Sequence, residues 1–72
     1  MTKKVCLITG GAGFLGQRYC EYFLSKNYKV ICVDNNAKNL KKIKSFNLDD
    51  LKTFRCDISK ENEVKKLFKS IN

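Results

Sequence analysis

Apolar runs and amphipathic stretches alternate along the chain. Three runs are apolar or β-branched over most of their length, which is typical of short strands that are buried on both faces. They span residues 3–9, 29–34 and 51–58. Three further stretches carry apolar side chains at helical spacing among charged ones. They span residues 14–26, 37–46 and 60–71. The pattern predicts the element order β-α-β-α-β-α.

Each predicted helix has one apolar stripe that should face a sheet. In the first helix the stripe consists of Leu15, Tyr19 and Phe23, with Cys20 and Leu24 beside them. The second has a thinner edge of Leu40, Ile43 and Phe46, and the third has Val64, Leu67, Phe68 and Ile71. Asn36 and Ser59 are expected to cap the second and third helices, because Asn and Ser side chains accept hydrogen bonds from free helix amides.

Strands that are joined by single helices run parallel, and their crossovers are right-handed. We therefore expect an α/β fold with a three-stranded parallel sheet in the order 3-2-1. The first two helices should cover one face and the last helix the other, which gives three layers and half of a Rossmann-type doubly wound fold. A sheet face that stays uncovered could support self-association.

All four glycines of the chain lie in the segment TGGAGFLG, residues 9–16. Two overlapping motifs run through it: G-x-G-x-x-G uses Gly11, Gly13 and Gly16, and G-x-x-G-x-x-G uses Gly10, Gly13 and Gly16. A missing Cβ permits a tight turn with positive φ, a close approach of the backbone to a pyrophosphate, and tight packing of the helix on the sheet.

The surroundings of the glycines decide between a flexible loop and a binding site. A predicted strand precedes them, and a predicted helix begins with Phe14 and Leu15, whose free amides and positive dipole end suit phosphates. Asp34 follows Gly16 by 18 residues and ends the second strand, where a carboxylate can accept hydrogen bonds from ribose hydroxyls. We interpret residues 1–72 as the N-terminal dinucleotide-binding portion of a Rossmann domain, a fragment without a catalytic half.

Asp34 also indicates which dinucleotide should bind. A carboxylate at this position repels the 2′-phosphate of NADP and pairs well with the free ribose diol of NAD. Asn35 and Asn36 follow it and are neutral, so no arginine takes the place of the acid. The predicted cofactor is NAD rather than NADP, with Asn35 beside it.

Charge and length exclude several other classes of function. The net charge is +8, and eight of the 15 basic residues are lysines on two predicted helices. These lysines lack the interleaved aromatic side chains that stack on bases, so we expect a solvated surface and no nucleic-acid partner. No apolar run approaches the roughly 20 residues of a membrane span, and MTKK does not begin a secretory signal. A cytoplasmic location is expected.

The four cysteines form no metal-ligand pattern. Cys6, Cys20, Cys32 and Cys56 contain no CxxC pair, and the chain has no histidine. We expect buried, reduced thiols that behave as small apolar side chains, and no metal site.

The segment TGGAGFLG, the VD that ends at Asp34, and the CDIS after the third apolar run together resemble the short-chain dehydrogenase/reductase superfamily. The resemblance covers essentially the whole chain. It implies that Asp57 and Ile58 contact the adenine ring. The alternative for Asp57 is a turn residue at the entry of the last helix.

Two branches of this superfamily are similar to different parts of the chain. Phe14, where the short branch usually has glycine, resembles the extended branch of nucleotide-sugar epimerases and dehydratases. CDISKENEVKKLF resembles the short branch, which oxidises alcohols or reduces carbonyls. We favour the short branch slightly, because its resemblance spans more of the chain.

The resemblance implies hydride transfer between substrate and nicotinamide, with a proton exchanged by the tyrosine of a Tyr-x-x-x-Lys motif on a later helix. Tyr22 and Lys26 have this spacing but lie on the first helix, so we interpret the match as a coincidence and name no catalytic residue. The expected function is that of an NAD(H)-binding segment that is inactive alone. A non-catalytic NAD(H)-sensing module is the alternative.

Overall fold

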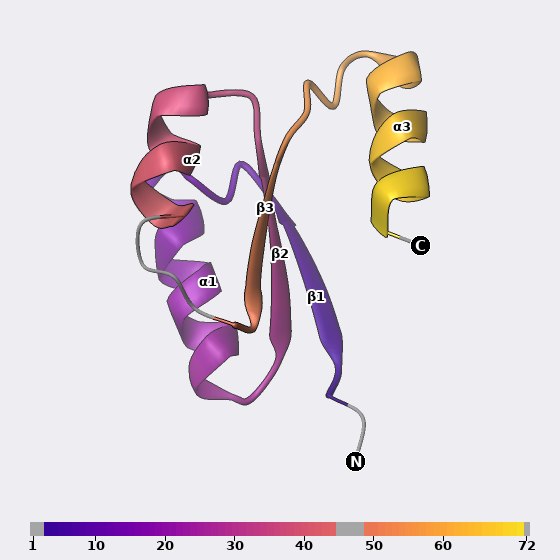
Figure 1. Cartoon of the computed structure of the whole chain (residues 1–72). Coiled ribbons are helices and arrows are strands. Elements are labelled where there is room, and N and C mark those ends of the chain that lie inside the picture. Colours follow the sequence, from indigo (N-terminus) through magenta and orange to yellow (C-terminus); the bar gives the residue numbers. More distant parts are fainter. Residues whose placement is uncertain (1–2, 45–48, 72) are drawn as a thin grey trace.

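The structure, a computed structural model, describes residues 3–44 and 49–71. Within these residues strands and helices alternate in the predicted order (Figure 1). The elements are β1 (Val5–Thr9), α1 (Phe14–Ser25), β2 (Lys29–Asp34), α2 (Ala37–Lys44), β3 (Leu51–Arg55) and α3 (Glu61–Ile71).

The described strands form one parallel sheet in which β2 lies between β1 and β3. Leu7 of β1 lies opposite Ile31 of β2, and Cys32 of β2 lies opposite Thr53 of β3. This is the predicted order 3-2-1, counted from the other edge. Because the strands are parallel, all their carboxyl ends lie at one edge of the sheet, where the turns into the three helices begin.

The helices occupy both faces of the sheet. Figure 1 shows α1 and α2 side by side on one face and α3 on the other. Side chains of β2 alternate between the two layers, since Val30 and Cys32 pack toward α1 and α2 while Ile31 and Val33 pack toward α3. The three-layer arrangement is therefore as predicted.

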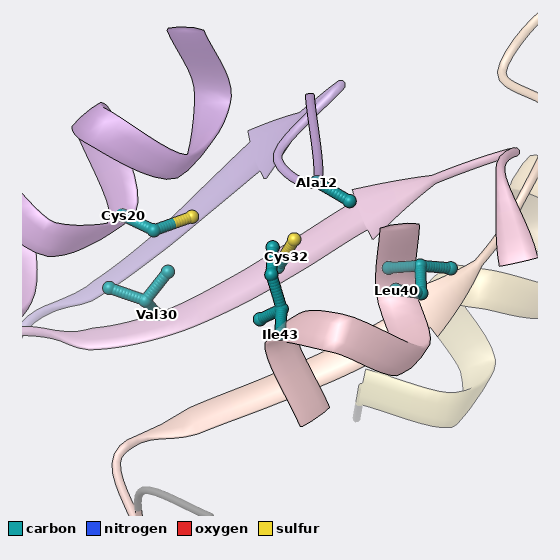
Figure 2. Close-up of a cluster of buried hydrophobic side chains, with 6 residues drawn as sticks. All are labelled: Ala12, Cys20, Val30, Cys32, Leu40 and Ile43. Carbon is teal, nitrogen blue, oxygen red and sulfur yellow. The ribbon is translucent and has the colours of Figure 1, made fainter. Parts of the chain in front are cut away.

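Each layer has its own apolar core. The larger cluster lies between the sheet and the first two helices (Figure 2) and consists of Ala12, Cys20, Val30, Cys32, Leu40 and Ile43. The smaller one lies under α3 and consists of Ile31, Val33, Cys56 and Leu67. The side chains of β2 contribute alternately to the two cores. This explains why the strand is apolar along nearly its whole length.

The predicted inward stripe of α1 is wrong at two positions. Leu15 and Tyr19 are 64% and 51% exposed. The face toward the sheet instead runs through Gly16, Cys20, Phe23 and Leu24. Gly16 lies against the backbone of the glycine turn, and this contact fixes how α1 is rotated about its own axis. Leu15 and Tyr19 each precede a sheet-facing residue by one position, so their side chains point away from the sheet, to one side of the helix.

The expectations for α3 need two corrections. Leu67 is buried, but Phe68 is 53% exposed, because it lies beside the inward line of the helix. Ser59 is not the N-cap, since α3 begins at Glu61. The Ser59 hydroxyl donates to Oδ1 of Asp57 at 2.6 Å instead.

The second helix and the third strand follow the sequence more closely. Asn36 caps α2 as predicted, because its Oδ1 accepts a hydrogen bond from the amide of Asn39 at 3.1 Å. The third strand ends at Arg55, earlier than predicted, although the amide of Cys56 still donates to the carbonyl of Asp34 at 3.1 Å. Phe46 lies outside the described residues. In the described part of the chain, no helix has the length and apolar character needed to cross a membrane.

Candidate dinucleotide-binding site

The turn between β1 and α1 is built from residues 10–13. Gly10 has φ of +63°, a conformation that side chains with a Cβ rarely adopt. Its carbonyl accepts a hydrogen bond from the amide of Gly13 at 3.1 Å, which closes the turn. The amide of Gly11 donates to the carbonyl of Val33 at 3.1 Å and ties the turn to the end of β2.

Two glycines are required by close packing within the protein. A Cβ on Gly11 would lie 2.6 Å from Sγ of Cys32 and 2.9 Å from the carbonyl oxygen of Ile8. A Cβ on Gly16 would overlap the carbonyl oxygen of Gly10 and lie 2.7 Å from Cα of Gly11. These positions allow α1 to start directly against the turn.

Gly13 differs from the other two because its backbone and its neighbours would both accept a side chain. It is the N-cap of α1, with an extended backbone at φ −75° and ψ 174°. A Cβ built there would meet only the carbonyl oxygen of Gly10 within 4 Å, at 3.4 Å. The missing side chain therefore leaves room outside the turn, where a ligand can approach the backbone.

The first turn of α1 presents unpaired amides beside this space. The first intrahelical bond runs from the amide of Gln17 to the carbonyl of Gly13 at 2.9 Å. The amides of Phe14, Leu15 and Gly16 have no acceptor among residues 3–44 and 49–71. No acidic side chain lies in this first turn, so the positive end of the helix is not neutralised there. The arrangement suits a phosphate group.

Asp34 connects the end of β2 to the glycine turn. Its Oδ2 accepts a hydrogen bond from the amide of Ala12 at 3.1 Å, and its Oδ1 accepts one from the amide of Asn36 at 2.9 Å. A carboxylate has about four acceptor positions, so these two bonds leave capacity for ribose hydroxyls. Asn35 is exposed next to it. The bond to Ala12 was not predicted from the sequence, although Ala12 lies inside the motif.

Asp57 and Ile58 follow β3 at the same edge of the sheet. The amide and the hydroxyl of Ser59 both donate to Oδ1 of Asp57, and Oε1 of Glu63 accepts from the Asp57 amide at 3.1 Å. The hydrogen bonds from Ser59, helped by the nearby Lys60 and Arg55 charges, lower the pKa of the Asp57 carboxyl below its usual range. The bonds from Ser59 place Asp57 in the turn before α3, and Ile58 is left 58% exposed.

The structure therefore brings the candidate residues together to different degrees. A direct hydrogen bond joins Asp34 to Ala12 in the glycine turn, and a second one joins the neighbouring Val33 carbonyl to the amide of Gly11. Asp57 and Ile58 share the strand-end edge, but within the described residues the Asp57 side chain bonds only to Ser59.

Two thiols lie directly beneath the glycine turn. Sγ of Cys20 lies 3.7 Å from the carbonyl oxygen of Gly11, and Sγ of Cys32 lies 2.6 Å from the position that a Cβ on Gly11 would take. Both thiols belong to the larger core cluster (Figure 2). The hydrogen bond with Cys20, together with burial, raises the pKa of the Cys32 thiol, and the same bond lowers the pKa of Cys20. Cys20, Cys32 and Cys56 are buried as predicted, whereas Cys6 is only partly buried.

Tyr22 and Lys26 lie at the opposite end of α1 from the glycine turn. Nζ of Lys26 lies 5.6 Å from the centroid of the Tyr22 ring, and both residues are exposed. About 13 Å of helix separates Tyr22 from Gly13 at 1.5 Å per residue. Neither side chain reaches the strand-end edge.

Comparisons with known proteins agree with this architecture. The model of the NAD dependent epimerase/dehydratase family matches residues 6–72. The chain belongs to this family. The matched segment of the chain extends from β1 to the end of α3 and so includes the glycine turn, Asp34 and the turn at Asp57.

Individual family relatives come from both branches considered above. UDP-glucose 4-epimerase of Bacillus subtilis is 30% identical over 66 residues, which cover 86% of this chain and 20% of that protein. The short chain dehydrogenase/reductase dpfgG of Gibberella zeae is 35% identical over 74 residues, which cover 100% and 27%. The chain thus spans about a quarter or less of the length of these two relatives.

Among solved structures, the 3-ketoacyl-(acyl-carrier-protein) reductase of Brucella melitensis, complexed with NADH, superposes with a TM-score of 0.85. Its sequence is 28% identical, and the match covers 93% of this chain and 28% of that one. The fold is therefore that of the nucleotide-binding part of Rossmann dehydrogenases. Family and fold together support binding of a nicotinamide dinucleotide.

Proposed function

We propose that residues 1–72 are the N-terminal dinucleotide-binding portion of an NAD-dependent enzyme and hold NAD(H) across the carboxyl ends of β1, β2 and β3. The observation that carries the proposal is the open space at Gly13 beside three amides that have no acceptor among the described residues. A pyrophosphate needs both features, because its oxygens must approach the backbone closely and accept hydrogen bonds there.

Each part of the strand-end edge has one binding role in this proposal. The amides of Phe14, Leu15 and Gly16 bind the pyrophosphate, with Gly10, Gly11 and Gly13 shaping the turn. Asp34 accepts hydrogen bonds from the adenosine ribose, and Asn35 lies beside it. Ile58 is exposed and apolar, which suits contact with the adenine ring, and Asp57 holds the turn that presents it.

The preference for NAD over NADP rests on Asp34. Its carboxylate lies at the end of β2 with both oxygens already oriented by backbone amides. A 2′-phosphate on the ribose would meet this negative charge, whereas a free diol can donate to it. Asn35 supplies no positive charge to compensate.

A bound nicotinamide dinucleotide supplies hydride transfer, and the residues of this chain bind and orient it. We propose an alcohol or carbonyl as the substrate class, as in the short branch. The second candidate is a nucleotide sugar, acted on by an epimerase or dehydratase. It is favoured by the family model that matches residues 6–72 and by the similarity to UDP-glucose 4-epimerase.

Calorimetric titration of NAD tests the proposed site. Gly13→Val fills the open space with a branched side chain, and we expect it to weaken NAD binding at least about tenfold, because the pyrophosphate can no longer reach the amides. Ser25→Val is the matched control, since Ser25 is exposed at the far end of the same helix. Undiminished affinity in a folded Gly13→Val variant contradicts the site.

A further inference from the structure

We infer that Asp34 is also a positioning residue that holds the glycine turn in its binding shape, independently of any contact with ribose. This inference rests on the proposed function and deepens it. It assigns to one carboxylate the preorganisation of the pyrophosphate amides as well as recognition of the ribose.

The first support is the small number of bonds that hold the turn. Among the described residues, two hydrogen bonds tie it to β2: Gly11 to the carbonyl of Val33, and Ala12 to Oδ2 of Asp34. Only the second comes from a side chain and carries a full charge. Hydrogen bonds to ionised acceptors are stronger than neutral ones, so removal of this bond should matter most to the turn.

The second support is the burial of Ala12. Ala12 is 1% exposed and belongs to the core between α1, α2 and the sheet (Figure 2). A backbone amide in such surroundings needs an acceptor, because a buried unpaired donor is costly. Asp34 supplies that acceptor.

The third support is the way the carboxylate itself is held. The amide of Asn36 donates to Oδ1, so the bond to Ala12 does not depend on a freely rotating side chain. On the other side of the turn, Nε2 of Gln17 donates to the carbonyl of Ala12 at 2.9 Å. Ala12 is therefore held from β2 and from α1, between glycines that would otherwise have wide conformational freedom.

Two nucleotides separate the ribose role from the positioning role. ADP offers a pyrophosphate and a ribose diol, whereas 2′,3′-dideoxy-ADP offers the same pyrophosphate with no diol for Asp34 to bind. We expect Asp34→Ala to weaken binding of 2′,3′-dideoxy-ADP about tenfold, which corresponds to loss of one charge-assisted hydrogen bond. Asp34→Asn should lose less, because its amide oxygen can still accept from Ala12.

Asp49→Ala is the control for charge. It removes one carboxylate from an exposed turn before β3, at the opposite edge of the sheet, and so changes the net charge equally. Affinity of this variant for both nucleotides should stay within about twofold of the original, a small energy on the affinity scale. Removal of a negative charge should by itself favour an anionic nucleotide, so an equal loss in Asp49→Ala and Asp34→Ala would assign the effect to a general disturbance of the chain and overturn the positioning role.

Amide hydrogen exchange gives a readout that needs no ligand. In the unsubstituted chain the Ala12 amide should be protected, and in Asp34→Ala and Asp34→Asn it should exchange faster, while the Val33 and Leu40 amides keep their rates. If Ala12 is unprotected in the unsubstituted chain, the inference fails even where no variant folds.

The outcomes distinguish this inference from the proposed function. Suppose that the unsubstituted chain binds ADP, and that Asp34→Ala weakens the binding of ADP but leaves the affinity for 2′,3′-dideoxy-ADP unchanged. Asp34 then acts only through the ribose, and the positioning role is overturned. If the unsubstituted chain binds neither nucleotide, the proposed function fails, and Ala12 exchange still decides the positioning role.

Discussion

Gly16→Ala tests whether the packing of α1 against the glycine turn is as tight as the structure indicates. Gly16 is the third residue of α1, where helix propensity alone favours alanine over glycine by about 0.8–1 kcal/mol. Against this, the added Cβ would overlap the Gly10 carbonyl oxygen and lie 2.7 Å from Cα of Gly11. The two effects have opposite signs, so their magnitudes decide the outcome.

The steric cost should exceed the gain in propensity. Overpacking of side chains typically costs about 1–3 kcal/mol, and here the obstructing atoms are backbone atoms that cannot rotate away. To relieve the clash of the new Cβ, α1 would have to move away from the turn. This movement would also disturb the packing of Cys20 and Ala12. We expect a net loss near 2 kcal/mol, from a clash of about 3 kcal/mol less a gain of about 1.

Urea unfolding followed by circular dichroism measures this change. With a slope of about 1 kcal/mol per molar urea for a small domain, a loss of about 2 kcal/mol lowers the midpoint by about 2 M. Gly13→Ala is the matched control, because its Cβ meets only one atom within 4 Å, at 3.4 Å, and an alanine N-cap costs at most about 1 kcal/mol. A Gly16→Ala midpoint that is unchanged or higher, or equal losses in both variants, refutes the close approach.

Two further predictions concern α3 and the turn before it. Leu67→Ala should destabilise the fold by about 2–5 kcal/mol, because Leu67 is buried under α3, whereas Phe68→Ala at an exposed position should cost less than about 1 kcal/mol in the same urea assay; equal losses would contradict the assigned face. Asp57 has a lowered pKa in the folded chain, so its contribution to stability is present above its ordinary pKa of 3.8 and is lost as the pH falls through the lower folded pKa. Ser59→Ala should move this pKa upward toward the ordinary value in an NMR titration, and an unchanged pKa would mean that the Ser59 hydroxyl does not stabilise the carboxylate.

Local signals in the sequence were sufficient for the element order and the glycine turn, and the strand order followed from the rules for parallel strands that are joined by helices. Alternation of apolar runs with helical stripes, and a positive-φ glycine directly after a strand, depend on residues close together in the chain. The rotation of α1 could not be predicted in this way, because it is set by contact of Gly16 with Gly10 and Gly11. The pattern of large apolar side chains assigns glycine to no face of the helix, and it therefore predicts that Leu15 and Tyr19 face inward.

The hydrogen bonds of two polar residues were not predicted correctly from the sequence, for a related physical reason. Ser59 is a good N-cap by residue type, but Asp57 competes for its hydroxyl, and the competition depends on where the chain turns after β3. In the same way, the sequence indicates that Asp34 ends β2, yet its bond to Ala12 forms only because β2 lies beside β1 in the parallel sheet. The sequence shows which residues can form such hydrogen bonds, but the fold determines which of them become partners.

The packing of the fold does not determine the residue type at position 14, which is phenylalanine in this chain. Phe14 is 82% exposed, and its ring meets the guanidinium of Arg18 at 5.5 Å from the centroid. Such an exposed position, in the ordinary φ range of a helix, neither needs a missing Cβ nor gains much from an aromatic ring. By contrast, Gly16 two residues later is fixed by backbone contacts. Packing within the described residues therefore does not select phenylalanine at residue 14, and this explains why packing alone does not distinguish the two branches.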